Sequence, residues 1–120
     1  MHSELLFPSF QISSIENNDE LSGRNCGTTL ASSTIFTRLL LENINYNKES
    51  NEMETDVSIL ADNLEMKIDQ IIFLNKPCSA LDQGYTAILK LELTSLELLK
   101  TYFVTLKQNE YISLQLPPKD

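Results

Sequence analysis

Alternating apolar and polar positions predict strands over much of the chain. The clearest alternation covers residues 86–93, where Ala87, Leu89, Leu91 and Leu93 alternate with Thr86, Ile88, Lys90 and Glu92. A period of two residues is that of a strand with one buried face. Short runs of apolar, β-branched and aromatic residues predict further strands at residues 5–12, 34–42, 71–75 and 111–116. Pro8 confines the first of these to a sheet edge or a bulge.

Residues 57–68 allow two interpretations, because a helix and a strand would each bury several of their apolar positions. We favour a bent strand, since the alternation changes phase at residues 62–63, which indicates a β-bulge. Residues 69–70 (Asp-Gln) then predict a tight turn into the strand at 71–75, so that the two strands form a hairpin.

Residues 94–108 have the spacing of an amphipathic helix. Apolar side chains at steps of three and four form one stripe, made of Leu96, Leu99, Phe103 and Leu106. Thr94 and Glu97 have the spacing of a capping box, in which each side chain accepts a hydrogen bond from the backbone amide of the other. We therefore expect the helix to begin after Thr94 and to pack its stripe into the core.

Three segments carry too few apolar residues to predict a buried strand. Residues 13–33 are polar and interrupted by two glycines, so we expect a short helix around residues 14–21 or disorder. Residues 43–56 are rich in Asn and Glu and predict a mobile loop. Residues 76–84 contain Pro and Gly and predict a connecting loop.

Composition and charge narrow the possible functions. The 120 residues suit a single domain, residues 1–120, and a hydrophobic content of 42% is enough to build a core. The net charge of −8, with no basic cluster, excludes a nucleic-acid partner and disfavours an anionic membrane surface. No apolar run reaches the roughly 18 residues of a membrane span, and the first residues do not form a signal peptide.

Cysteine and histidine content narrow the chemistry further. Cys26 and Cys78 are isolated, so we expect reduced thiols and, without an export signal, a cytoplasmic location. His2 is the only histidine, which leaves no base for Ser-His-Asp or Cys-His catalysis. The glycine-rich phosphate-binding motifs are absent as well. With no recognisable catalytic constellation, the sequence leaves open whether the protein is an enzyme.

The second half of the chain resembles a known superfamily. Four segments carry the resemblance: LEMKIDQIIFLN (64–75), KPCSALDQGY (76–85), TAILKLELTSLELLKTYFVTLKQ (86–108) and NEYISLQLPP (109–118). They resemble segments of the PhnB-like branch of the glyoxalase/bleomycin-resistance/dioxygenase superfamily. The first segment is similar to that family's third and fourth strands, and the second to the crossover between its two modules. The third is similar to the opening strand and helix of the second module, and the fourth to the strand that follows. This superfamily is also called the vicinal oxygen chelate fold.

The resemblance implies an α+β fold made of βαβββ modules around a curved mixed or antiparallel sheet. Module one would cover about residues 4–75, and a partial module two about residues 85–118. The sequence departs from the family in the weak helix of module one and in Leu60, near which the family often has a histidine. It also stops at Asp120, before two further strands, so we expect module two to be truncated.

The resemblance also indicates where a ligand would bind. Active members of the superfamily hold a divalent metal through His, Glu or Gln from both modules. The corresponding positions here hold Phe10, Gln11, Leu91 and Glu92, with Phe73 near the end of the fourth strand. These residues make a poor metal site, so we predict no metal and no other cofactor.

Glu65 and Glu92 lie on predicted strands and could point into a cavity, although carboxylates on the polar side of a half-buried sheet commonly face water. The candidate ligand-binding residues are therefore Phe10, Gln11, Glu65, Phe73 and Glu92.

Three functional hypotheses follow. The first is a metal-free small-molecule-binding or vestigial member of the superfamily, and the second is a protein-interaction or structural subunit that binds a partner through exposed sheet edges. The third is an enzyme that takes residues from a second copy. We expect a homodimer, because the predicted strands at 86–93 and 111–116 would have open edges. Alternatively, residues 13–33 fold over these edges and keep the chain monomeric.

Overall fold

The computed structural model describes residues 8–16 and 19–116. Its strands are β1 (Ser9–Ile15), β2 (Leu21–Asn25), β3 (Leu30–Ala31), β4 (Ile35–Phe36), β5 (Arg38–Asn47), β6 (Glu52–Ala61), β7 (Met66–Phe73), β8 (Lys76–Cys78), β9 (Ala80–Leu81), β10 (Thr86–Leu91) and β11 (Glu110–Gln115). The helix is α1 (Leu93–Phe103). His2, the predicted strand positions 5–7 and the prolines after β11 lie outside the described residues.

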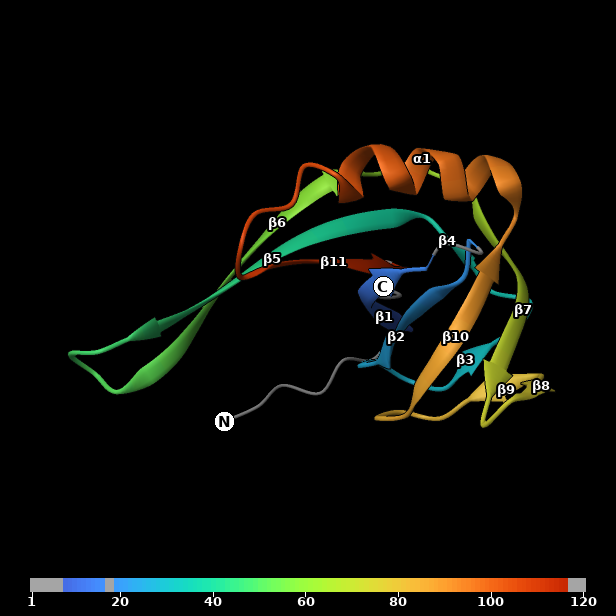
Figure 1. Ribbon diagram of the computed structural model, residues 1–120, viewed down its shortest axis with the longest axis horizontal. Coiled ribbons are helices and arrows are strands. Elements are labelled where there is room, and N and C mark those ends of the chain that lie inside the picture. Colours follow the sequence, from blue (N-terminus) through green and yellow to red (C-terminus); the bar gives the residue numbers. More distant parts are fainter. Residues whose placement is uncertain (1–7, 17–18, 117–120) are drawn as a thin grey trace.

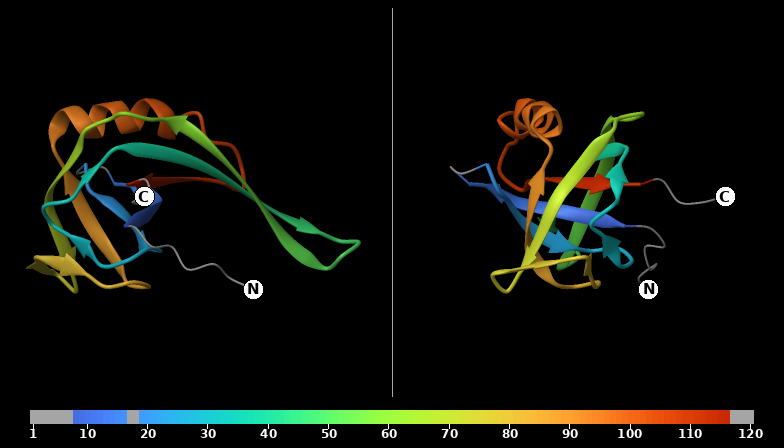
Figure 2. Two further views of the ribbon diagram at one scale, coloured as in Figure 1. Left: turned by 180° about the vertical axis from the view of Figure 1, so that it is seen from behind. Right: turned by 90° about the vertical axis from the view of Figure 1, so that its right-hand side faces the viewer.

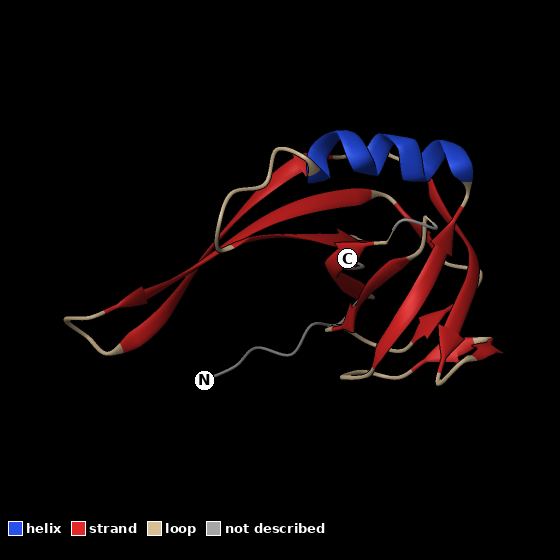
Figure 3. Cartoon of the chain, in the orientation of Figure 1, coloured by secondary structure: helices blue, strands red, loops and turns tan. Residues whose placement is uncertain are grey.

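The main sheet is antiparallel throughout and curls into a half-barrel. Its strand order is β4-β7-β10-β2-β1-β11-β5-β6, and β8 pairs with β7. α1 lies across one side of the curl, and strands make up most of the rest of the described chain (Figures 1, 2 and 3). This arrangement is consistent with the expected α+β class and with a curved antiparallel sheet.

The hairpin of β1 and β2 lies between the two strands that were expected to have open edges. β1 pairs with β11 from Ser9↔Gln115 to Ile12↔Ile112, and β2 pairs with β10. Both neighbours of β10 and of β11 are therefore present, so the argument for a homodimer from these edges is wrong. Residues 13–33 supply β2, which covers the edge of β10, whereas residues 9–12 of β1 cover the edge of β11. The helix expected around residues 14–21 is not formed in the described part of that segment.

A glycine allows β1 and β2 to approach closely. A Cβ atom on Gly23 would lie 2.2 Å from the Gln11 carbonyl oxygen and 2.5 Å from Cε2 of Phe10. Because one of these neighbours is backbone, it cannot move aside as a side chain would. The glycine that weakened the strand prediction for this polar segment is thus what allows the strand to pack there.

The core lies inside the curl and beneath the helix. Its fully buried large side chains come from almost every strand and from α1: Phe10, Ile12, Leu21, Leu30, Phe36, Leu39, Met66, Ile71, Leu81, Leu89, Leu99 and Ile112. Leu96 is buried as well, and Phe103 and Leu106 are half-buried against the same core. The predicted apolar stripe therefore faces the core, although the helix ends at Phe103 rather than at residue 108.

The predicted capping box is wrong. The helix begins two residues earlier than expected, so that Glu92 is the N-cap and makes no side-chain capping bond. The Thr94 hydroxyl donates to Oε1 of Glu92 at 2.9 Å. The helix start is held to β7 instead, because the buried Ser95 hydroxyl accepts from the Lys67 amide at 3.2 Å.

The predicted bulge and the predicted turn are interchanged. β7 runs unbroken through residues 69–70. Its pairing with β10 shifts register at this point, between Lys90 and Leu91 of β10, which marks a bulge. The chain turns at residues 62–63, where Asn63 has a φ of 56°. A hairpin joining residues 57–68 to 71–75 is therefore wrong, because β6 and β7 lie at different places in the sheet.

Both predicted loops contain strands. Residues 43–56 form the outer part of the β5–β6 hairpin, and Asn51 (φ 58°) lies near its tip. Residues 76–84 contain β8 and also β9, which pairs with β3. The β5–β6 hairpin extends well beyond the curled body, with its tip far from the helix (Figure 1).

Candidate functional site

The projecting β5–β6 hairpin, residues 40–59, is the most unusual surface of the described chain, and we call it the arm. Directly opposed residues of an antiparallel pair point to the same face of a sheet. One face carries four such pairs, Leu40↔Ile59, Glu42↔Val57, Ile44↔Thr55 and Tyr46↔Met53. We call it the apolar face, because only Glu42 and Thr55 interrupt it.

The apolar face is open to solvent. Tyr46, Met53, Val57 and Ile59 are 53%, 64%, 57% and 55% exposed. Single exposed apolar side chains are ordinary on soluble proteins, but contiguous apolar patches commonly mark binding surfaces. The four exposed apolar side chains of the arm lie on two paired strands, within eight paired positions, and so form such a patch.

The opposite face of the arm is polar and acidic. Its pairs are Leu41↔Ser58, Asn43↔Asp56, Asn45↔Glu54 and Asn47↔Glu52. This side continues from the core side of the body, since Leu41 also pairs with the buried Ile112. The polarity therefore inverts where the hairpin leaves the body: the side that is apolar in the core becomes polar, and the outward side becomes apolar.

Within the described part of the chain, the outer edge of β6 has no neighbouring strand. β6 ends the strand order, pairs only with β5, and is exposed from Glu52 to Ile59. At the other end of the sheet, β4 has only two residues. A long edge strand presents unpaired amides and carbonyls that can pair with another chain.

Side-chain hydrogen bonds shape the tip of the arm. Oδ1 of Asn47 accepts from the amides of Glu49 and Ser50 at 2.9 and 3.3 Å, and its Nδ2 donates to Glu54 at 2.9 Å. The Tyr46 hydroxyl donates to Asn51. These bonds hold the turn, so the arm ends in a defined hairpin.

A small polar cluster lies at the root of the arm. The Ser113 hydroxyl donates to the carboxylate of Glu42. Burial raises the pKa of the nearby Cys26 thiol; the Arg24 guanidinium opposes this and the Glu42 carboxylate adds to it. The raised pKa keeps Cys26 protonated at neutral pH, which makes it a weak nucleophile.

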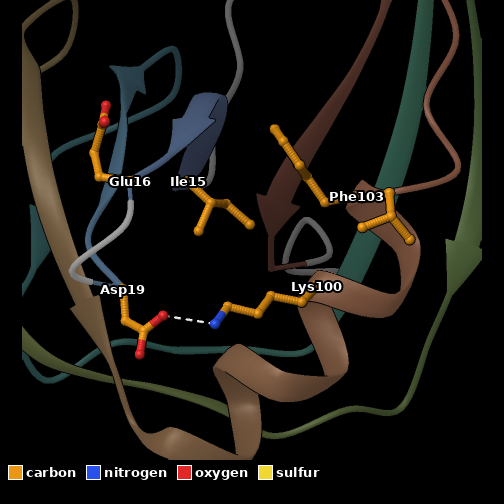
Figure 4. A pocket seen from close by; sticks show the side chains of 6 residues that line it. Ile15, Glu16, Asp19, Lys100 and Phe103 are labelled. Atoms are coloured by element: carbon orange, nitrogen blue, oxygen red, sulfur yellow. Dashed lines mark hydrogen bonds and ion pairs between the residues drawn. The ribbon is translucent and has the colours of Figure 1, made fainter.

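A second candidate site is a shallow hollow between the β1–β2 turn and the end of α1. It has a volume of about 370 Å³ and is lined by Ile15, Glu16, Asp19, Lys100, Phe103 and Val104. Nζ of Lys100 lies 2.6 Å from Oδ1 of Asp19, and this pair raises the pKa of Lys100 (Figure 4). The lysine and the aspartate neutralise each other, so the carboxylate of Glu16, which accepts from the Ser14 hydroxyl, is the remaining charged group that lines the hollow.

The five candidate ligand-binding residues do not line this hollow. Phe10 is fully buried in the core, and Gln11 lies on the opposite side of β1, beside Arg24. Phe73 lies at the end of β7, where its ring meets that of Tyr85 edge-on at 5.1 Å. Phe10 and Gln11 therefore point to opposite faces of β1, and Phe73 lies in a different part of the sheet.

Glu65 and Glu92 come near each other at the start of α1. The Glu65 carbonyl accepts from the Ser95 hydroxyl at 3.4 Å, and the Glu92 amide donates to the Lys67 carbonyl at 3.0 Å. Glu65 is exposed, and it lies just before β7 rather than in a strand. Their backbones thus join the helix to β7, and neither residue lines the hollow beside α1.

The sequence reasoning missed the arm, although a signal was present. Residues 52–59 alternate strictly between the acidic or hydroxyl residues Glu52, Glu54, Asp56 and Ser58 and the residues Met53, Thr55, Val57 and Ile59. That is the pattern of a strand with two different faces. The Asn-rich and Glu-rich composition of residues 43–56 obscured it.

Metal sites, membrane spans and similarity to known proteins were also considered as indications of function. Within residues 8–16 and 19–116, no group of three His, Cys, Asp or Glu side chains could hold a metal ion, and no helix is long and apolar enough to cross a membrane. Comparison with protein-family models, with curated proteins and with solved structures gave no match.

Proposed function

We propose that this protein is a protein-interaction subunit that docks a partner on its arm. The observation that carries the proposal is the exposed apolar face on a projecting hairpin whose outer strand has a free edge. Such a surface offers both apolar contact and backbone hydrogen bonds to a partner.

The placement of the apolar residues supports binding over simple solvation. Polar residues on both faces would keep a projecting hairpin soluble, yet one face concentrates Tyr46, Met53, Val57 and Ile59. Covering the exposed part of each would contribute on the order of 1 kcal/mol, so the four together would contribute several kcal/mol. The side chains also stand on a regular strand pair, so little backbone conformational freedom is lost on binding.

The test uses a photo-reactive amino acid in place of Tyr46, introduced in living cells of the source organism. The arm should then become covalently joined to a specific protein. That protein, purified, should bind the wild-type chain and lose about tenfold or more in affinity for a Val57→Thr/Ile59→Thr variant, because two apolar contacts are removed while strand propensity is kept.

Ile35→Thr is the matched control, because Ile35 is a β-branched, exposed strand residue outside the arm. Its affinity for the same protein should equal that of the wild type. The proposal fails if no protein is joined to the arm, or if the double variant and the control bind the joined protein equally well.

A small-molecule-binding role is the second candidate, and the hollow beside α1 supports it. Its volume of about 370 Å³ falls within the range of small-molecule pockets. In this candidate the chain would be a metal-free relative of the glyoxalase superfamily whose first βαβββ module has strands and no helix in its described residues, 8–16 and 19–75. A thermal-shift screen of metabolites with the wild type and a Phe103→Ala variant tests it; stabilisation that survives the substitution would exclude the hollow.

We also propose that the interaction takes place in the reducing cytoplasm. Cys26 and Cys78 are both unpaired thiols, as expected where disulfides do not persist. A fluorescent fusion at either end, followed in the source cells, tests the location; accumulation outside the cytoplasm would contradict it.

A further inference from the structure

We propose that the occupant of the arm is an extended, basic segment of another protein, which adds to β6 as a new strand and alternates cationic with apolar residues. This inference rests on the proposed function, because it names the partner chemistry of the same surface. It follows from three properties of β6: its free edge, the alternation of its apolar and acidic side chains, and its uncompensated negative charge.

The free edge determines the shape of the occupant. β6 is paired with β5 along Glu52–Ala61, so its backbone is already held in the extended form that a new strand requires. An added strand pairs the outward amides and carbonyls of β6, whereas a helix or a globular surface would leave them unpaired. The stretch from Glu52 to Ile59, exposed throughout, is long enough for an ordinary strand.

The alternation of β6 determines which residues the occupant needs. Residues of an added strand that lie opposite Met53, Val57 and Ile59 would face the apolar side. Residues in between would face the acidic side. Opposed residues on one face interact directly, so apolar and cationic side chains must alternate with a period of two.

The negative charge of β6 determines the sign of the charge that the occupant must carry. Glu52, Glu54 and Asp56 face the Asn residues of β5, which carry no charge. The ion pairs of the described chain join Arg38 to Asp62, Lys90 to Glu20 and Lys100 to Asp19, and none of them reaches these three carboxylates. Lys or Arg on the added strand would supply the missing opposite charge.

The same charges disfavour a second copy of this chain at the edge. In an antiparallel pairing of two β6 strands that aligns their apolar faces, even-numbered residues lie opposite even-numbered residues. Every register that overlaps these acidic positions then opposes two carboxylates: Glu54 faces Asp56, Glu54 or Glu52 of the partner, or Glu52 or Asp56 faces its own copy. Like charges directly opposed destabilise a strand pair, whereas a basic segment meets no such penalty.

The test uses synthetic peptides of about eight residues that alternate Lys with Val and Thr, labelled for fluorescence anisotropy. The wild-type protein should bind this peptide about tenfold or more tightly than the same peptide with Glu in place of Lys. The preference should shrink between about 0.05 M and about 0.3 M salt, because surface charges are screened. Binding should also shift the amide resonances of β6.

Two further peptides test strand addition on the wild-type protein. One carries N-methyl groups on its Lys residues and the other on its Val and Thr residues. Because only one edge of an added strand pairs with β6, one of the two should bind normally and the other should not. Equal binding of both would refute strand addition.

A charge-reversal variant, Glu52→Lys/Glu54→Lys/Asp56→Lys, completes the test. Its circular dichroism should match the wild type, and it should prefer the Glu peptide to the Lys peptide. Equal affinity of the wild type for the two peptides would overturn the inference. So would a wild-type dimer in sedimentation that Val57→Thr/Ile59→Thr dissociates, because the occupant would then be a second copy. In either case a cross-linked partner that depends on the apolar face would leave the proposed function standing.

Discussion

Replacing Asn25 should destabilise the protein more than any comparable polar substitution on its surface. Asn25 ends β2 and is fully buried. Its side-chain amide donates to the carbonyls of Thr28 and Leu81, each at 2.9 Å, and its Oδ1 accepts from the Gly27 amide at 3.0 Å. One side chain thus ties together the end of β2, the loop after it and β9.

The size of the effect follows from these three hydrogen bonds. Asn25→Ala removes all of them and leaves two carbonyls and one amide without their partner. At about 1 kcal/mol for each lost bond, the free energy of unfolding should fall by about 3 kcal/mol. That is a large share of the roughly 5–15 kcal/mol that stabilises a domain, and the melting temperature should fall by about 10 °C.

Asn25→Asp separates the hydrogen bonds from the shape of the side chain. A carboxylate has nearly the same volume, but it would direct a second acceptor at the carbonyls of Thr28 and Leu81. The loss at neutral pH should therefore equal or exceed that of Asn25→Ala. Protonation restores one donor, so the loss should shrink between about pH 7 and about pH 4.

The assay is urea unfolding followed by circular dichroism, with Asn45→Ala as the matched control. Asn45 is an exposed Asn of β5, and its replacement should change stability by less than about 0.5 kcal/mol. If Asn25→Ala were as mild as this control, or if Asn25→Asp were as stable as the wild type at neutral pH, the three hydrogen bonds would not hold this part of the fold.

Three further predictions concern stability and pH. Gly23→Ala should cost about 2 kcal/mol or more in urea melts, since the new methyl would overlap the Gln11 carbonyl oxygen; a neutral result would show that β1 and β2 can separate. Leu74→Asn should raise stability by about 1 kcal/mol, because Leu74 is 77% exposed and has a φ of 52°, and a lower melting temperature would contradict this. Burial raises the pKa of Cys26 above its ordinary value of 9.0, so its contribution to stability is complete below that pH and is lost as the pH rises above it. Melts between about pH 7 and about pH 10.5 should therefore fall more steeply for the wild type than for Cys26→Ser, and parallel curves would argue against a raised pKa.

Elements with one buried face and one solvent-exposed face could be predicted from the sequence. β10 and the core stripe of α1 follow the periods of a strand and a helix, because each packs one side on the core. β11 was expected at residues 111–116 and lies at Glu110–Gln115. In β10 and α1 the burial of one face imposes the pattern, whereas β11 is buried on both faces from Ile112 to Gln115 and was predicted from its short apolar run.

The remaining elements depend on contacts that a local pattern does not record. β2 is polar because it packs through Leu21 and Gly23, and the glycine is explained only by the Gln11 carbonyl oxygen and the Phe10 ring beside it. Turns and bulges each shift the alternation by one residue, which is why residues 62–63 and 69–70 were interchanged. The positive φ of Asn63 now identifies the turn.

The candidate site was not predicted, for a related reason. The predicted site residues were expected to surround a cavity. The arm is instead a projecting surface whose apolar side chains face solvent. Phe10, assigned to a ligand site through the superfamily resemblance, lies in the core instead. Only the cross-strand register joined Tyr46 to Met53 and defined a single face.

The place of the β1–β2 hairpin in the sheet has a consequence for how the protein is made. β1 leaves the ribosome early but pairs with β11, which is synthesised about a hundred residues later. The β5–β6 hairpin, by contrast, closes through neighbouring residues and can form while the chain is still growing. The arm and its exposed apolar face should therefore exist before the body that carries them. A nascent chain stalled after residue 85 would present the arm without a completed sheet, and that intermediate is where chaperones would be expected to act.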